Sequence, residues 1–386
     1  RGALVVAEVA LSFTLLIGAG LLGRSFSHLL SVDKGFDADG VITAHLVLPA
    51  SRYPEKHQQR AFFAAAQERL AALPGVKYAA FVNDLPLVGG TNGTVVIDGR
   101  TFPQGEEPMS EKRIVTPGYF EALRIKVVDG RAFTDRDRPG APLVVIVNQA
   151  FVRRFFPGER ALGKRVDFAW ETNGLQEIVG VVADVREQSL SEPAAPAMYV
   201  PLAQRPEARM SLVVRAAGEP RPLVPRLREA VYAVDRNLPL ADVRTLGDIV
   251  ALALAGRTIA LSLFGAFSAL ALILAAVGLY AVVSYSVAQR QREIGIRMAL
   301  GAHPVEVTRS VLVQGLLLIA AGAFVGALAA LGFGRFLAGL VFGVGTSDPA
   351  TFGGVALVLA ATALFASLVP ALRASRVDPA RVLGAE

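Results

Sequence analysis

Four long apolar runs limit what this 386-residue chain can fold into. They cover residues 3–22, 258–287, 311–333 and 352–372, and Glu8 is the one charged residue in them. A helix needs about 20 apolar residues to cross a bilayer. Helices buried in a soluble core seldom run this long without a charge. The runs therefore predict four transmembrane helices.

Composition supports a membrane protein and argues against several other classes. Hydrophobic residues make up 53% of the chain and the mean hydropathy is +0.47, too apolar for a soluble protein of this length. The net charge of +6 suggests nucleic acid as a partner, but no Lys/Arg block or basic–aromatic alternation accompanies it. We therefore expect no nucleic acid partner.

Cysteine is absent, so disulfides, thiol catalysis and thiolate metal sites are impossible. The histidines are scattered without the spacing of metal ligands: His28, His45, His57 and His303. Residues 158–164 fit most of a phosphate-binding loop, but Arg165 stands where Ser or Thr should hold magnesium, and no apolar strand precedes it. We expect no catalytic, cofactor or metal site in this chain.

The apolar runs and the sequence between them predict the domain organisation. We expect an α-helical membrane protein with four transmembrane helices and a large mixed α/β extracytoplasmic domain inserted between the first and second. The expected helices are 1–30, 251–288, 308–335 and 352–372, and the inserted domain is 31–250, in two lobes. The remaining segments are a charged helix at 289–303, a short extracytoplasmic loop at 336–351 and a tail at 373–386.

Arginines predict the orientation, because short cytoplasmic loops are enriched in Lys and Arg. The loop before the third span and the tail are rich in arginine. The loop contains Arg290, Arg292, Arg297 and Arg309, and the tail contains Arg373, Arg376 and Arg381. The 336–351 connection has no arginine, and Arg335 stands at its edge. Both of these segments are therefore predicted to be cytoplasmic. The inserted domain then lies outside.

Alternating patterns and turn residues predict the elements of the inserted domain. Strands are expected at 41–48, 76–82, 94–97, 143–147, 176–182, 199–200 and 211–215. Helices are expected at 57–73, 117–123, 148–155 and 223–234, with Asn148 as an N-cap and 246–255 leading into the second span.

The most informative segment is residues 289–302, QRQREIGIRMALGA. Glu293 and Arg297 are four apart, in the favourable order for a helical ion pair, and Arg290 lies on the same stripe. Ile294 and Met298 form a neighbouring apolar strip. A short helix held between two spans cannot slide away, so it is suited to carry force from a soluble partner. The alternative is an ordinary positively charged loop with a frayed helix.

This segment resembles the R-x-x-E-I-G-I-R-x-A-L-G-A signature of permease subunits in the MacB/FtsX family of ABC transporters. The resemblance extends over essentially the whole chain, including Pro117-Gly118-Tyr119-Phe120, Gly130-Arg131-Ala132-Phe133-Thr134, Glu177-Ile178-Val179-Gly180-Val181-Val182, Ala276-Val277-Gly278-Leu279-Tyr280 and Pro370-Ala371-Leu372-Arg373-Ala374. It implies a coupling helix that contacts an ATPase through Arg290, Arg292, Glu293, Ile294, Gly295, Arg297 and Met298.

The resemblance also implies partners and a location. We expect a cytoplasmic ABC ATPase on a separate chain, a second permease unit, the lipid bilayer of a bacterial inner membrane, and an extracytoplasmic substrate or protein that the sequence does not identify. Because the first residue is Arg1, we expect the C-terminal half of a duplicated eight-span permease, although a homodimer is the other arrangement. The function implied is mechanotransmission, in which ATP hydrolysis moves the outer domain. The alternative is an FtsX-like scaffold that activates a cell-envelope protein.

Glu8 is the intramembrane polar candidate. A charge inside a span is by default a candidate for function. The simpler interpretation is that Glu8, a few residues from the cytoplasmic end, reaches the interface or a basic partner.

Overall fold

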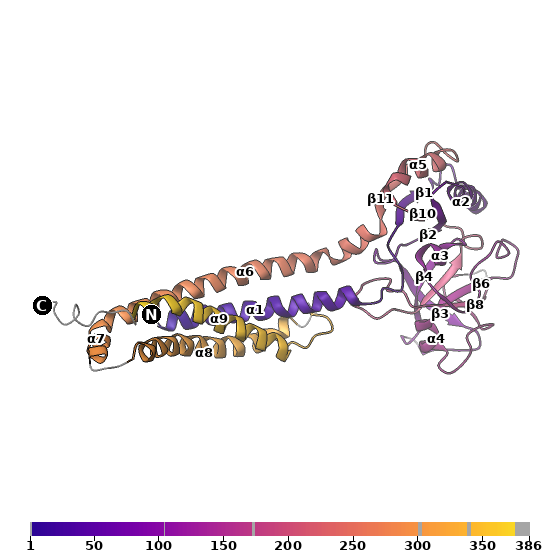
Figure 1. Cartoon of the computed structure of the whole chain (residues 1–386). Coiled ribbons are helices and arrows are strands. Elements are labelled where there is room, and N and C mark those ends of the chain that lie inside the picture. The colour runs from indigo at the N-terminus through magenta and orange to yellow at the C-terminus, as the bar shows by residue number, and fades with distance from the viewer. Residues whose placement is uncertain (1, 104, 172–173, 300–302, 338–340, 375–386) are drawn as a thin grey trace. The chain divides into compact units, whose positions relative to one another are not determined.

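The computed structural model describes residues 2–103, 105–171, 174–299, 303–337 and 341–374 (Figure 1). They divide into two compact units. The inserted domain comprises residues 32–254, and the helical unit combines residues 1–31 with 255–386. Each unit has its own core and is described by itself.

The inserted domain is built on one eleven-stranded sheet. Its strands are β1 Val41–Val47, β2 Val76–Val82, β3 Thr91–Ile97, β4 Met109–Val115, β5 Val127–Gly130, β6 Val144–Asn148, β7 Arg165–Phe168, β8 Gln176–Val182, β9 Ala197–Pro201, β10 Arg209–Ala216 and β11 Ala241–Thr245. Its helices are α2 Lys56–Ala71, α3 Tyr119–Leu123, α4 Gln149–Phe155, the 3₁₀ turn η1 Arg221–Leu223, and α5 Val224–Tyr232.

The sheet has an open part and a closed part. Strands β11, β1, β10 and β2 follow one another antiparallel, and β2 joins β4 through the pair Val82 and Val115. From β4 the order continues through β3, β7, β8, β6 and β9, and β9 returns to β4 in parallel. This closes a ring of six strands. The expected two lobes correspond to no break in the sheet, and that division stays a prediction.

Two hydrophobic cores cover the sheet, and each runs across both of its parts. One contains Phe62 and Phe63 of α2, Phe151 of α4 and Leu227 of α5. The other packs the short helix α3 against the strands, with Tyr119 as one of its members. Strands buried on both faces follow from this arrangement: every residue of β6 and β9 is buried.

Most predicted elements of this domain are confirmed, and the shorter ones were missed. The predicted helices correspond to α2, α3, α4 and α5. Asn148 caps α4 as expected, since its side chain accepts a hydrogen bond from the Phe151 amide at 2.9 Å. Strands β4, β5, β7 and β11 were not predicted because they are short or lack alternation. All of β5, for example, is exposed.

The helical unit contains α1 Gly2–Ser31, most of α6 Leu246–Gln289, α7 Gln291–Ala299, α8 Pro304–Leu337 and α9 Pro349–Ala374. Helices α1, α6, α8 and α9 are each long and apolar enough to cross a membrane. The predicted spans 251–288, 308–335 and 352–372 lie within α6, α8 and α9, and the span 1–30 lies within α1 apart from residue 1, which is outside the described residues. The predicted helix at 246–255 is continuous with the second span as the start of α6.

Glycines allow α8 to pack closely against α1, which runs alongside it (Figure 1). A Cβ atom on Gly322 would lie 2.6 Å from Val9 Cβ, and one on Gly326 would lie 2.7 Å from the carbonyl oxygen of Ala10. The Thr14 hydroxyl donates to the Gly326 carbonyl at 3.2 Å. Small residues at a helix interface are a common means of close packing in membranes.

A buried charge network lies inside the inserted domain. The Arg113 side chain is fully buried, and its guanidinium contacts Glu187 at 3.1 Å and Glu111 at 3.2 Å. The Tyr199 hydroxyl donates to Glu187 at 2.9 Å. Burial raises the pKa of Glu187 above its ordinary value, although Arg113 and the Tyr199 hydroxyl oppose this. One cation therefore balances two buried carboxyl groups from distant parts of the sequence.

Replacing Arg113 with Met should lower the free energy of unfolding by about 3–5 kcal/mol, because two buried carboxyl groups lose their cation. Urea unfolding of the full chain in detergent, followed by the fluorescence of Trp170, measures this. Trp170 is the single tryptophan of the chain and stacks on Phe168 in the inserted domain. The matched control is Arg165→Met, whose pair with Asp98 is exposed and should contribute less than about 1 kcal/mol. Equal effects of the two substitutions would contradict the role assigned to Arg113.

Glu187→Gln should alter the pH dependence of stability. A raised pKa means that the folded domain takes up this proton at a higher pH than the unfolded chain. The burial cost of the charged group is present above the folded pKa and is relieved as pH falls through it. The stability of the parent protein relative to Glu187→Gln should therefore increase as the pH is lowered from above the raised folded pKa toward the ordinary pKa of glutamate. A difference that stays constant over this range would show that Glu187 does not titrate there.

Candidate functional site

Helix α7 is separated from α6 by a single turn residue, Arg290. The Arg290 amide donates to the carbonyl oxygens of both Ser286 and Val287, each at 3.2 Å, which ends α6. The Ile294 amide donates to the Arg290 carbonyl at 2.9 Å, so α7 follows at once. The break falls where the apolar run changes to five consecutive polar residues, 289–293.

One face of α7 borders a cavity of about 160 Å³ formed with the end of α6 and the start of α8. Arg290, Glu293, Ile294 and Arg297 line it from the α7 side. Ile294 is half-buried and packs against the core of the helical unit. The predicted stripe of Arg290, Glu293 and Arg297 is therefore brought together, with Ile294 as its anchor.

The predicted ion pair within α7 is present. Arg297 Nη2 contacts Glu293 Oε1 at 2.5 Å, with the two side chains 63% and 52% exposed. A pair this exposed, four residues apart on a helix, contributes about 0.3–0.5 kcal/mol to stability. It holds the geometry of a short helix and contributes little to the stability of the whole protein.

The opposite face of α7 carries Arg292 and Ile296, which lie four residues apart and are both exposed. At 100° per residue they point about 160–200° away from Ile294. The Ile296 side chain is 44% exposed. Arg292 was among the predicted site residues, whereas Ile296 was not. Counting helical phase from Ile294 would have found it.

Polar contacts tie the neighbouring helices together beside this cavity. Gln314 of α8 donates from Nε2 to the Ser286 hydroxyl of α6 at 3.2 Å. Neither residue was predicted as part of the site, because both lie inside apolar runs and are 28 positions apart. Gly295 and Met298 belong to α7, and nothing further is described of them. Residues 300–302 lie outside the described residues.

Glu8 faces α6 inside the helical unit. A Cβ atom on Gly278 would lie 2.3 Å from Glu8 Oε2, so only glycine leaves room for this carboxyl group. Glu8 Oε2 is buried and accepts no hydrogen bond within the described part of the chain. The structure does not bring Glu8 together with Glu293 or Arg297, and none of the described cations pairs with it.

Residues 158–164 form no phosphate-binding loop joined to a helix, and Lys164 instead pairs with Glu159 at 3.0 Å. Among the described residues, no group of three or more histidines or carboxylates is placed to hold a metal ion.

Four membrane-length helices, a mixed α/β domain inserted after the first and a charged helix between the second and third define a class of integral membrane protein. Residues 3–223 match the MacB-like periplasmic core domain, and residues 265–379 match the FtsX-like permease C-terminal domain. The chain belongs to the MacB/FtsX family of ABC transporter permeases. The predicted resemblance and fold class are thereby confirmed.

ABC transporter permeases and ATP-binding/permease proteins are among the similar proteins. The ABC transporter permeases YvrN and YknZ of Bacillus subtilis (strain 168) are 25% and 28% identical, over 70% of this chain and 68% of each relative. The pyoverdine export ATP-binding/permease protein PvdT of Pseudomonas aeruginosa is 26% identical over 69% of this chain and 41% of its own length.

Two solved structures of extracytoplasmic domains are similar to part of this chain. The periplasmic region of MacB from Actinobacillus actinomycetemcomitans has a TM-score of 0.39 at 15% identity, covering 58% of this chain and 97% of that one. The extracellular domain of YknZ has a TM-score of 0.35 at 20% identity, covering 52% of this chain and 99% of that one.

Gly278→Ala should destabilise the helical unit by about 1–3 kcal/mol, because the added methyl group overlaps the Glu8 carboxyl group. Glu8→Ala in the same chain should restore most of the loss. Unfolding in mixed detergent micelles measures both. Gly265→Ala is the matched control, since no atom lies within 4 Å of a Cβ there. If the double variant is as unstable as Gly278→Ala alone, the Glu8 carboxyl group is not the reason that position 278 requires glycine.

Proposed function

We propose that this chain is a permease subunit that converts ATP hydrolysis by a separate cytoplasmic ABC ATPase into movement of its extracytoplasmic domain. One observation carries the proposal: α7 is a short charged helix between two membrane-length helices, with one face anchored and the other exposed. Family membership supports it, because the relative PvdT is described as an ATP-binding/permease protein.

The roles of the α7 residues follow from their two faces. Ile294 anchors the helix, while Arg290 and the Glu293–Arg297 pair line the cavity shared with α6 and α8. Arg292 and Ile296 supply the contact with the ATPase, one charged and one apolar side chain. Gly295 and Met298 complete the segment. A partner that pushes on the outer face of α7 would thus transmit force to both α6 and α8.

The arginines of the 289–310 loop support a cytoplasmic α7, since short cytoplasmic loops carry excess positive charge. Four spans then place both ends of this segment in the cytoplasm and the inserted domain in the periplasm of a bacterial inner membrane.

Helix α6 is the element suited to carry the movement. Its 44 residues run without a break, and at 1.5 Å per residue it is about 66 Å long. The hydrocarbon core of a bilayer is about 30 Å thick. A displacement at its cytoplasmic end therefore reaches the extracytoplasmic side through one continuous hydrogen-bonded helix.

The proposal requires further chains. The described residues contain no phosphate-binding loop joined to a helix, so ATP is bound on the ATPase. A pair of ATPases needs two permease units. The second is a fused upstream half or another copy of this chain. The output is export or extraction of a substrate from the periplasm or the outer leaflet.

The test begins with the full-length protein purified in mild detergent from its own cells, with identification of any stoichiometric ABC ATPase and assay of its activity. Arg292→Ala with Ile296→Ala should lower permease-dependent ATPase activity at least about tenfold while leaving the fold intact, because both side chains are exposed. Glu293→Ala with Arg297→Ala should also uncouple the two proteins, with a stability loss of about 0.5 kcal/mol or less.

Arg309→Ala is the matched control, because Arg309 is an exposed cation of the same loop that lies on α8 instead of α7. It should retain activity. Full activity in both double variants would contradict the coupling role of α7. A preparation without any ATPase, under conditions that preserve other membrane complexes, would favour the FtsX-like scaffold instead.

A further inference from the structure

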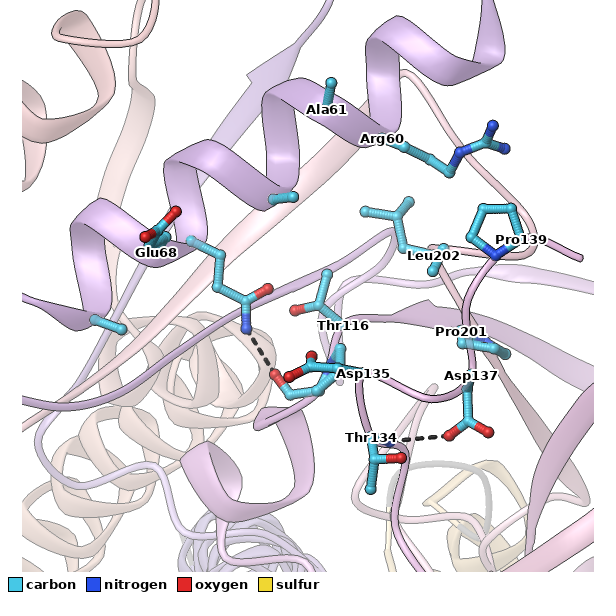
Figure 2. Close-up of a pocket in the computed structure, with 15 residues that line it drawn as sticks. Arg60, Ala61, Glu68, Thr116, Thr134, Asp135, Asp137, Pro139, Pro201 and Leu202 are labelled. Carbon is cyan, nitrogen blue, oxygen red and sulfur yellow. Dashed lines mark hydrogen bonds between the residues drawn. The ribbon is translucent and has the colours of Figure 1, made fainter. Parts of the chain in front are cut away.

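The inserted domain contains a cavity of about 550 Å³ that the coupling mechanism does not use. One wall is helix α2, and the other is formed by the chain after β4, the loop at 134–139 and the end of β9. Figure 2 shows α2 passing over this opposite wall. The volume lies within the range of pockets that hold small organic molecules.

The walls are mostly apolar and are held in place by satisfied polar groups. Small or apolar side chains cover much of the surface: Ala61, Ala64, Ala71, Pro117, Pro139, Pro201, Leu202 and Ala203. Gln67 fastens α2 to the opposite wall, since its Nε2 donates to the carbonyl oxygens of Pro117 at 2.7 Å and Ala79 at 3.0 Å. Asp137 fixes the loop by accepting from the Thr134 amide at 2.9 Å and from Arg131.

Three charged side chains that line the cavity lack the polar partners that the wall-supporting groups have. Arg60, Glu68 and Asp135 form no ion pair or side-chain hydrogen bond with any described residue. Arg60 is half-buried, whereas the two carboxylates are exposed. The polar groups that support the walls are therefore paired, and the charges offered to the cavity are not.

The free charges are separated along the cavity. Arg60 begins the segment of α2 that lines the cavity and Glu68 lies near the other end, as Figure 2 shows. They are eight positions apart, so their Cα atoms are separated by about 12 Å along the helix axis. Asp135 adds a second negative charge on the wall that faces α2. The cavity is thus positive at one end and negative elsewhere, with an apolar surface between.

The geometry points to a binding site for a short apolar peptide with free termini. Its carboxylate would be held by Arg60, its ammonium group by Glu68 and Asp135, and its side chains by the alanine, proline and leucine surface. An extended chain covers about 3.3–3.6 Å per residue, so three or four residues span about 12 Å. Arginine suits a carboxylate because its guanidinium donates two parallel hydrogen bonds.

The inference does not rest on ATPase coupling. Binding at this cavity needs only the inserted domain, and the Arg292→Ala, Ile296→Ala variant should bind peptide as the parent protein does. Loss of coupling and loss of peptide binding are therefore separable results.

Calorimetry on the full chain in lipid nanodiscs tests the site, with the tetrapeptide Ala-Leu-Leu-Ala as the probe. Saturable binding is expected, and N-acetylation or C-amidation should each weaken it about tenfold, the equivalent of one charged hydrogen bond. The dipeptide Ala-Leu should bind more weakly than the tetrapeptide because it cannot reach both ends.

Variants assign the contacts. Arg60→Gln should weaken the free acid about tenfold and leave the C-amidated peptide unchanged. Arg69→Gln is the matched control, since Arg69 is exposed on α2 outside the cavity. Ala64→Trp should abolish binding by filling the cavity, whereas His57→Trp, exposed on α2 outside it, should not.

Three results would overturn the assignment. They are no saturable binding to the parent protein, binding that Ala64→Trp leaves intact, and equal affinity for the free and doubly blocked peptides. The last would show that the unpaired charges do not recognise the ligand.

Discussion

A bilayer offers no hydrogen-bond partners to a peptide backbone, and the organisation of this chain follows from that constraint. Each of the four apolar runs must satisfy its own amides, so each becomes a helix. Any polar segment between two of these helices is confined to one side of the membrane. The interval of residues 32–254 is long enough to form a domain with its own cores, whereas the segment that contains α7 is not. The interval after α1 therefore holds the large domain, and the interval between α6 and α8 holds the short charged helix α7.

The parts of the fold that sequence predicts are those set by local patterns. The spans followed from length and apolar content, and α2, α4 and α5 followed from helical periodicity and, for α4, the cap at Asn148. Strands such as β5 and β7, four residues each, are too short to show alternation. Arg113 and Glu187 are 74 residues apart and meet only through the sheet. No local pattern reports a contact of that kind.

The same distinction applies to the candidate site. The spacing of Arg290, Glu293 and Arg297 predicted one stripe, and these residues do line one cavity. Ile296 was missed because an isolated apolar residue stands out only when its helical phase is counted from Ile294 on the opposite face. Glu8 was recognised as unusual from its position in an apolar run. Its neighbour Gly278 lies 270 residues later, and the need for glycine there appears only when two helices are packed together.

The parallel pairing of β4 with β9 limits aggregation of the inserted domain through its strand edges. A strand at the margin of a sheet exposes unpaired amides and carbonyls that invite pairing with another chain. The ring of β4, β3, β7, β8, β6 and β9 removes most such margins. At the open end of the sheet, β11 is short and carries Asp242 and Arg244, whose side chains pair at 2.5 Å. The remaining margins, β11 and the four-residue strand β5, are both short, which makes edge-to-edge aggregation costly.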